Sequence, residues 1–350
     1  MTLQKMPEKK LYDIDFIRAL CCILVIVVHV TASFWSVSSE TSITFKVIVA
    51  LNTLSRFAVP SFLFISGFTL FYSYAPQHFS LGAFYHKRLS KVFAPYFLWS
   101  AFYTVLNYSS YVAPTGGISW RMFLKELTLG FSSYHLYFML IILQLYLIFP
   151  ALLWIYKRIN QPLVAFLFFA AVNLFFVIFT DLPLRDRMFP YYLLYFTAAF
   201  SFADLRLKGY AFSKVFYWVI SLAYFTALFY YGIDNYRVAL GVPQVSWRLF
   251  IYIFRIYGVI GSIGLYLLAE GLQQSRLKGW LRHPIISSLS RNSFTIYLVH
   301  PFFMMVYHWF ELRLFPGLLP LLPAFLLKLF SILAGSWIFC LIFEKLKKHY

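Results

Sequence analysis

Residues 12–36 read YDIDFIRALCCILVIVVHVTASFWS, an apolar stretch that follows the basic tail of residues 1–11. One α-helix needs roughly 20 apolar residues to cross a bilayer, so this stretch is long enough to span the membrane. It looks like a signal peptide, but it is too long, carries Asp15, Arg18 and His29, and lacks a small-residue cleavage site. We therefore expect a first transmembrane helix that is retained.

The whole chain shares this apolar character. Of its 350 residues, 61% are hydrophobic and 12% are charged, whereas soluble domains have roughly 45–50% and 25%. We therefore expect an all-α polytopic membrane protein with one integral-membrane domain over residues 1–350 and short tails at 1–11 and 344–350. The apolar runs predict about ten transmembrane helices, at about 12–36, 46–74, 92–113, 134–156, 163–180, 189–204, 214–232, 248–272, 293–311 and 319–343.

The positions of Lys and Arg predict the orientation in the membrane. With a cytoplasmic N-terminus, 18 of the 30 Lys and Arg residues fall on the cytoplasmic side, 8 fall on the opposite side, and the rest lie within predicted helices. Cytoplasmic loops carry the excess of positive charge. We therefore expect both termini in the cytoplasm.

Charge and cysteine usage exclude two classes of function. The formal net charge is +18, but the basic residues form short clusters between apolar runs instead of one continuous face, so nucleic-acid binding is not expected. Cys21, Cys22 and Cys340 lie within apolar segments and have no metal-ligand spacing. Neither a disulfide framework nor a metal site is expected.

Ionisable side chains in the first predicted helix are candidates for function, because such groups are energetically unfavourable within a bilayer. Arg18 and His29 are 11 residues apart, which is about 20° from three full turns and about 16.5 Å along the axis, so they share a face. A histidine at this depth suits proton transfer, or it hydrogen-bonds across a helix interface. Arg18 also stands three residues after Asp15, and the two can instead form an ion pair at the membrane edge.

Two later segments also place cations where they can bind anions. Arg56 precedes Pro60 and the run SFLFISGF at 61–68, where proline and glycine let a helix bend and its neighbours approach closely. A lone arginine there needs an anionic partner, a helix C-terminus or water. The predicted cytoplasmic loop HKRLSKVFAPY at 86–96 holds Arg88 and Lys91 three residues apart, which fits either a pyrophosphate clamp or the ordinary positive charge of a cytoplasmic loop.

The ninth predicted span and the longest outer connection complete the set of candidate segments. SFTIYLVHP at 293–301 places His300 directly before Pro301. A residue before proline is disfavoured in helical geometry, so we expect a broken helix that faces protein or a water-filled cavity. The outer connection at about 114–133 contains a short amphipathic stretch, Trp120–Leu129, which predicts a helix lying on the outer surface or over a site.

Together these segments resemble the membrane-bound acyltransferase 3 family, whose members O-acylate glycans and other acceptors. The resemblance covers essentially the whole chain and includes the family's plan of ten spans with both ends inside. It is carried by DFIRAL at 15–20, the spacing from Arg18 to His29, FISGF at 64–68, the basic loop ending in Pro95-Tyr96, and IYLVHP at 296–301. Members without an extra soluble domain, such as those that acetylate enterobacterial common antigen or exopolysaccharides, are the most similar in organisation.

The resemblance implies a membrane-bound O-acyltransferase in the plasma (inner) membrane of a bacterium. It would move an acetyl or succinyl group from cytoplasmic acyl-CoA, by default acetyl-CoA, to a hydroxyl of a cell-surface or lipid-linked glycan. Arg88, Lys91 and Arg18 would bind the CoA phosphates. Lys91 departs from the family, since many members carry arginine there and lysine cannot bind phosphate bidentately.

The resemblance also implies roles for the remaining site residues. His29 would be the general base or a transient acyl carrier, and Arg56 would stabilise the thioester oxyanion or form a structural ion pair. His300 would orient a partner or the acceptor. Trp120, Arg121 and Trp247 are candidates for contact with the acceptor.

Two other classes of function fit the sequence less well. In a transporter or exporter of polysaccharides, the buried Arg and His residues would line a pathway. Such proteins often have inverted repeats and paired broken helices, and the sequence shows neither. A membrane scaffold or sensor explains the helices but leaves the intramembrane charges without a role.

Overall fold

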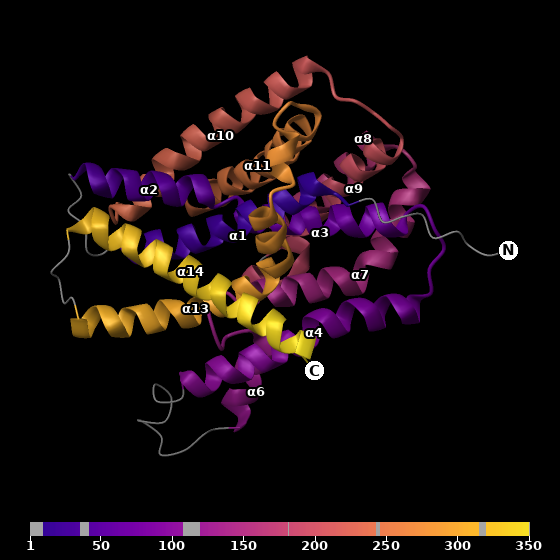
Figure 1. The fold of residues 1–350 in the computed structure, drawn as a ribbon. Coiled ribbons are helices and arrows are strands. Elements are labelled where there is room, and N and C mark those ends of the chain that lie inside the picture. The colour runs from indigo at the N-terminus through magenta and orange to yellow at the C-terminus, as the bar shows by residue number, and fades with distance from the viewer. Residues whose placement is uncertain are drawn as a thin grey trace. The chain divides into compact units, whose positions relative to one another are not determined.

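The computed structural model describes residues 10–35, 42–107, 120–180, 182–242, 246–314 and 320–349, and all regular structure in these ranges is helical (Figure 1). The chain forms two compact units: residues 1–61 with 214–350, and residues 62–213. The first contains α1 (Tyr12–Ala32), α2 (Ile43–Ser55), α10 (Lys214–Ala239), α11 (Trp247–Gln274), α12 (Lys278–Leu281), α13 (Pro284–Leu314) and α14 (Leu321–His349). The second contains most of α3 (Ala58–Tyr74), then α4 (Leu81–Leu106), α6 (Trp120–Leu129), α7 (Tyr137–Ile159), α8 (Pro162–Phe179), η1 (Arg185–Arg187), η2 (Phe189–Tyr191) and α9 (Leu193–Leu207).

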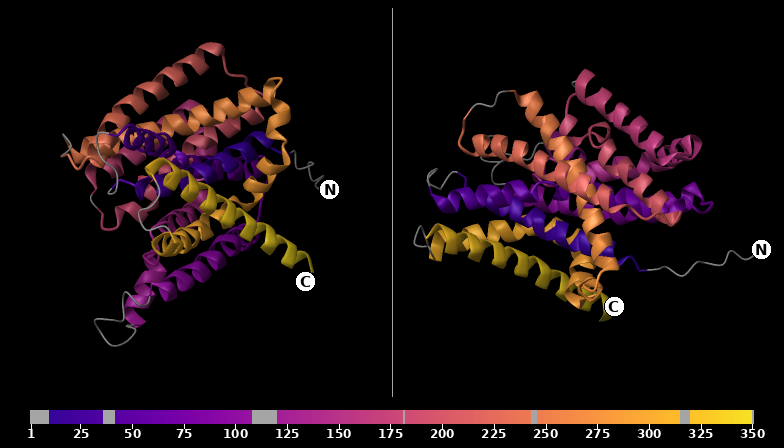
Figure 2. Two further views of the ribbon diagram at one scale, coloured as in Figure 1. Left: turned by 60° about the vertical axis from the view of Figure 1, so that its left-hand side comes forward. Right: turned by 90° about the horizontal axis from the view of Figure 1, so that it is seen from above.

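Helix α1 is central to the first unit. It packs against α2, α11, α13 and α14, and side chains on several sides of it are buried, including Ile14, Cys21 and Val30. Helices α13 and α14 run side by side in opposite directions in the views of Figures 1 and 2. Because α1 is enclosed by other helices, polar side chains along it can reach protein partners inside the membrane.

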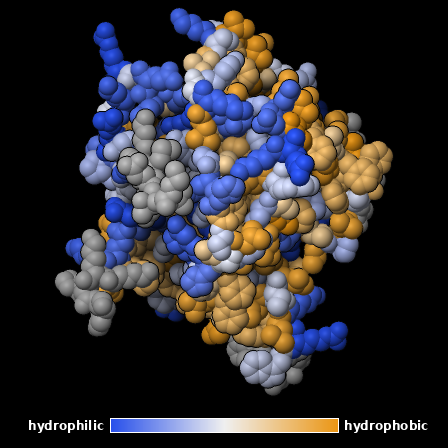
Figure 3. Space-filling model, turned by 90° about the vertical axis from the view of Figure 1, so that its right-hand side faces the viewer, coloured by the Kyte–Doolittle hydropathy of each residue, from blue (hydrophilic) through white to orange (hydrophobic). Residues whose placement is uncertain are grey.

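Exposed faces of the helices are apolar, as expected of a protein in contact with lipid. On α10, five large side chains fall at the spacing of one helix face and are mostly exposed: Val215, Trp218, Leu222, Phe225 and Phe229. Figure 3 shows broad hydrophobic areas on one side of the molecule. In water such surfaces would cause aggregation, whereas in a bilayer they are in contact with the lipid chains.

Seven stretches among the described residues are long and apolar enough to cross a membrane: α1, Ile43–Tyr74 (α2 with α3), α7, α8, α10, Leu249–Gln274 of α11 and Leu321–Leu346 of α14. The other three predicted crossings correspond to α4, α9 and α13. Helix α9 has only 15 residues, fewer than the roughly 20 needed for one crossing. The chain is thus a multi-pass helical membrane protein, while the count of ten, the cytoplasmic termini and the single domain remain predictions.

The second predicted helix, 46–74, is interrupted in the structure. Helix α2 ends at Ser55, and α3 begins at Ala58. In a continuous helix the residue at position 60 would donate its N–H to the carbonyl of Arg56, but Pro60 has no N–H. The break therefore places Arg56 at the C-terminal end of α2 instead of within a helix.

Two predicted element boundaries are wrong. The segment 86–96 is not a loop but lies within α4, which begins at Leu81 after the Ser80 side chain accepts a hydrogen bond from the Ala83 N–H. Ser80 is a typical N-cap residue, and the helix continues through Pro95. Likewise α13 starts nine residues before the predicted 293 and runs through Pro301 without a break.

The short helix predicted at Trp120–Leu129 is present as α6 with these bounds. Its C-terminal carbonyls are capped by Arg187, whose Nη1 donates to Leu129 O (2.9 Å) and Gly130 O (2.8 Å). A cation is favourable at this end of a helix. Residues 114–119 of the predicted outer connection lie outside the described residues.

Gly67 generates a prediction about packing in the second unit. A Cβ atom at this position would lie 2.1 Å from the backbone oxygen of Phe196 in α9, so Gly67→Ala must displace one helix. We expect a loss of at least ~1–3 kcal/mol, measured as a lower Tm in detergent. Gly232→Ala is the matched control, because its Cβ would meet only Thr53 Cγ2 at 3.8 Å and alanine favours the helix. An unchanged Tm for Gly67→Ala would contradict this packing.

Candidate active site

Two predicted site residues from opposite ends of the chain meet in the first unit. His29 on α1 and His300 on α13 stack, with ring centroids 5.2 Å apart and an interplanar angle of 23°. His300 is fully buried, and His29 is partly buried. The two imidazoles therefore form one cluster on the interface between α1 and α13, a pairing that no sequence motif predicts.

The position of His300 explains why α13 is not broken at Pro301. Proline cannot donate to the carbonyl four residues earlier, which is that of Tyr297. The Nδ1 atom of His300 lies 2.7 Å from this oxygen and replaces the missing donor. Because a carbonyl only accepts, Nδ1 carries the hydrogen, and Nε2 is the acceptor nitrogen of the neutral ring.

Arg56 is held against the turn of α1 that contains His29. Its Nε donates to Asn52 Oδ1 at 2.8 Å, and Asn52 Nδ2 donates to Val28 O (3.0 Å) and Thr31 Oγ1 (2.8 Å). The guanidinium also lies 5.5 Å from the centre of the Trp35 ring. The predicted oxyanion-binding cation is therefore connected to the helix of the predicted base through one amide side chain.

No carboxylate neutralises Arg56 among the described residues. Other cations in the first unit do have such partners: Arg18 is 3.7 Å from Asp15, and Lys328 is 3.7 Å from Glu311. The structural ion pair considered for Arg56 is thus not found in the described part of the chain. Its position at the C-terminal end of α2 favours a positive charge, and that charge can act on a bound anion.

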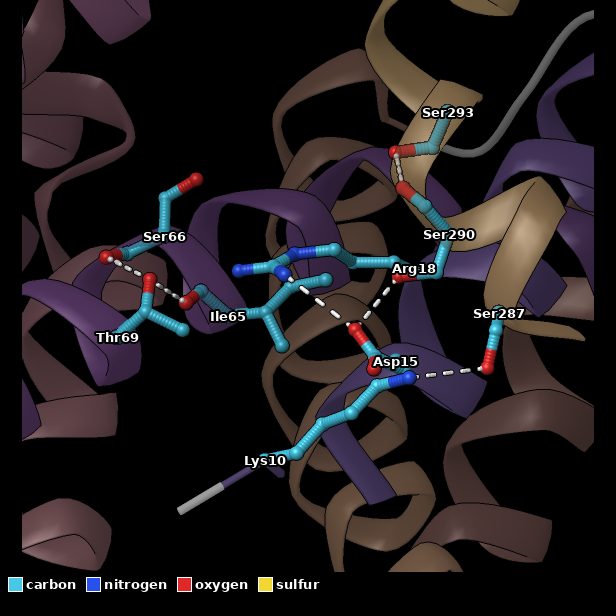
Figure 4. A network of polar contacts seen from close by, with 9 residues as sticks. All are labelled: Lys10, Asp15, Arg18, Ile65, Ser66, Thr69, Ser287, Ser290 and Ser293. Carbon is cyan, nitrogen blue, oxygen red and sulfur yellow. Dashed lines mark hydrogen bonds and ion pairs between the residues drawn. The ribbon is translucent and has the colours of Figure 1, made fainter. Parts of the chain in front are cut away.

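Arg18 lies in a polar network at the N-terminal end of α1 (Figure 4). Its Nη1 is 3.7 Å from Asp15 Oδ1, and Ser290 Oγ donates to the same oxygen at 2.8 Å. Lys10 Nζ donates to Ser287 Oγ at 3.3 Å. The ion pair considered for Arg18 is therefore present, and both serines lie in the part of α13 that precedes the predicted start at residue 293.

The two predicted phosphate-binding residues lie in the second unit, on α4. Arg88 Nε donates to Tyr74 OH at 3.3 Å, and its guanidinium lies 5.3 Å from the centre of that ring. Lys91 is exposed one turn further along α4, so the pair shares a side of the helix. Arg18 belongs to the other unit, and its participation in the same CoA site remains a prediction.

Sequence reasoning missed Asn52, which connects Arg56 to α1. The signal was an asparagine within an apolar stretch, one turn before an intramembrane arginine, a spacing at which side chains of a helix meet. Of the proposed acceptor contacts, Trp120 and Arg121 are exposed on α6. The side chain of Trp247 lies outside the described residues.

Comparison with known proteins identifies the relatives of this chain. The profile of the acyltransferase 3 family, described as an acyltransferase domain, matches residues 11–341. The chain is also 27% identical over 353 residues to YfiQ of Bacillus subtilis (strain 168), covering 93% of this chain and 90% of that protein, which is named as a candidate membrane-bound acyltransferase. No solved structure matches the chain.

The capping of Tyr297 by His300 predicts a coupling between two substitutions. His300→Phe keeps an aromatic ring but leaves the Tyr297 carbonyl without its donor, and a buried unsatisfied carbonyl costs roughly 1–3 kcal/mol. Pro301→Ala supplies a backbone N–H to the same carbonyl. We therefore expect the double variant to recover much of the Tm that His300→Phe loses. Additive losses in a double-mutant cycle would contradict the assignment.

Proposed function

The chain belongs to the acyltransferase 3 family and is an acyltransferase, and we propose that it transfers an acetyl or succinyl group from acyl-CoA to a hydroxyl of a cell-surface or lipid-linked glycan. The observation that carries the proposal is the arrangement around α1: His29 stacks on His300, and Arg56 is attached to the same turn through Asn52. A base near a cation that has no carboxylate partner in the described part of the chain suits acyl transfer.

In the proposed reaction His29 takes the proton of the acceptor hydroxyl, and the oxygen of that hydroxyl attacks the thioester carbonyl. Arg56 stabilises the negative charge that develops on the carbonyl oxygen. The carbon–sulfur bond then breaks, the ester forms, and the proton held by His29 passes to the CoA thiolate. His300 holds the ring of His29 by stacking.

A second route uses His29 as a transient acyl carrier. The imidazole attacks the thioester, CoA leaves as the thiol, and the hydroxyl then displaces the histidine from the acyl group. The two routes differ in one observable. Radiolabelled acyl-CoA without acceptor labels the protein in the second route and leaves it unlabelled in the first.

Donor binding is proposed for Arg88 and Lys91, with Arg18 as a further cation. One turn of helix separates Arg88 and Lys91, and lysine and arginine both bind phosphate well. The proposed orientation in the plasma (inner) membrane, with both termini cytoplasmic, presents α4 to the cytoplasmic pool of acyl-CoA. The glycan acceptor would approach from the opposite side, where Trp120 and Arg121 are candidate contacts.

We expect one substitution to weaken acetyl-CoA binding and another to abolish turnover. In detergent or nanodiscs, Arg88→Ala should weaken acetyl-CoA binding at least ten-fold, because a charge-assisted contact contributes about 1.5–3 kcal/mol. His29→Ala should bind acetyl-CoA normally, but it should lose both the transfer of the acetyl group and the slow hydrolysis of acetyl-CoA. Calorimetry and thiol release measure the two effects. Arg158→Ala is the matched control, since Arg158 stacks on Trp154 at 5.3 Å much as Arg88 does on Tyr74.

The same experiment separates an enzyme from a transporter. If the wild type binds and hydrolyses neither acetyl-CoA nor succinyl-CoA, the donor assignment fails and the export of polysaccharide becomes the better explanation. If His29→Ala inserts normally and keeps full activity, the assigned role of His29 is wrong.

Arg56 should contribute to the rate more than to donor binding. Removal of one group that stabilises an oxyanion typically lowers kcat by roughly 10²–10³-fold, and we expect a loss of this size for Arg56→Gln with little change in the KM for acyl-CoA. Arg56→Lys keeps the charge but loses the Nε bond to Asn52, so an intermediate kcat is expected. A normal kcat for Arg56→Gln would refute the role.

A further inference from the structure

Asn52 uses both ends of its amide in the cluster around His29. The side chain is fully buried. Its Nδ2 donates to Val28 O and Thr31 Oγ1, and its Oδ1 accepts from Arg56 Nε. One neutral side chain thus contacts the residue directly before His29 and the cation that has no carboxylate partner among the described residues.

The chemistry of these neighbours fixes the orientation of the amide. Arg56 Nε only donates, so the atom facing it must be the oxygen, and the carbonyl of Val28 only accepts, so the atom facing it must be the amide nitrogen. Aspartate has the same shape but lacks the N–H donors. It would place a negative charge against both Arg56 and the Val28 carbonyl.

Neighbouring helices hold this end of α2 in place. Asn235 Nδ2 on α10 donates to Thr53 Oγ1 at 2.8 Å and lies 3.5 Å from Asn52 Oδ1. Tyr257 OH on α11 donates to Thr53 O at 3.0 Å and lies 3.3 Å from Leu54 O, two carbonyls near the end of α2. Both polar atoms of the Asn52 amide are bonded, so Asn52 has little freedom to turn away from Arg56.

We propose that Asn52 is a positioning residue that fixes Arg56 beside the His29 turn while leaving the charge of Arg56 available to the reaction. This inference rests on the proposed acyl transfer. A carboxylate at the same place would also hold Arg56, but it would neutralise the charge that the oxyanion needs. A neutral acceptor therefore serves the position better than an acidic one.

The near-isosteric change Asn52→Asp tests the proposal. We expect kcat to fall roughly 10²-fold, near the value for Arg56→Gln, with the KM for acyl-CoA unchanged. Because both substitutions remove the same charge from the reaction, the double variant should lose much less rate than the product of the two separate losses. Asn173→Asp is the matched control: this buried asparagine of α8 donates to Pro190 O at 2.6 Å, and its substitution should lower the Tm without lowering kcat.

A normal kcat for Asn52→Asp, or rate losses that multiply in the double variant, would overturn the proposal. A second readout does not need turnover. If the carboxylate pairs with Arg56, then Arg56→Gln will lower the Tm of Asn52→Asp more than that of the wild type. Equal losses would show that the carboxylate adds nothing to the contact that Asn52 makes with Arg56. An inactive wild type with this Tm coupling would refute the acyl transfer and leave the contact standing.

Discussion

A backbone carbonyl inside a bilayer has no water to bond with, and the organisation of the first unit follows from this constraint. Pro301 leaves the Tyr297 carbonyl without its helical donor, and the ring of His300 supplies one. Near the end of α2 the hydroxyl of Tyr257 meets the carbonyls of Thr53 and Leu54. Side chains that restore these bonds lose their freedom to rotate, and the ring of His300, which stacks on His29, is fixed in this way.

Apolar packing and polar bonding have different tasks in this unit. The buried side chains of α1 hold it among α2, α11, α13 and α14, which gives the cluster a rigid centre. The polar bonds then select one orientation for each group: His300 by its carbonyl, Arg56 by Asn52, and Asp15 by Ser290. Catalysis by pre-oriented groups depends on both the apolar packing and the polar bonds, because a small displacement of a reacting group can lower the rate by a large factor.

The sequence was sufficient to predict the helical class and α6, because hydropathy is a local signal. It made His29, Arg18 and Arg56 candidates for function because their charges are unfavourable within a bilayer. It failed where a side-chain hydrogen bond, within one helix or between two, changes the outcome that a local rule predicts. Pro301 reads as a helix break until His300 is seen to replace the missing donor. Asn52 carries no charge, and only the structure shows that it bonds to α1. The start of α4 is not apparent from hydropathy, because its first turns carry several basic residues and its N-cap is Ser80.

The first unit is made from the two ends of the chain, residues 1–61 and 214–350, while the second is continuous. During synthesis the second unit can finish folding before α13 exists. Helix α1 is made well before α13, the helix against which it packs most extensively. His29 therefore has no His300 to stack on until nearly the whole chain has been made. A chain that ends after residue 213 but before His300 would therefore hold the whole second unit but no imidazole pair.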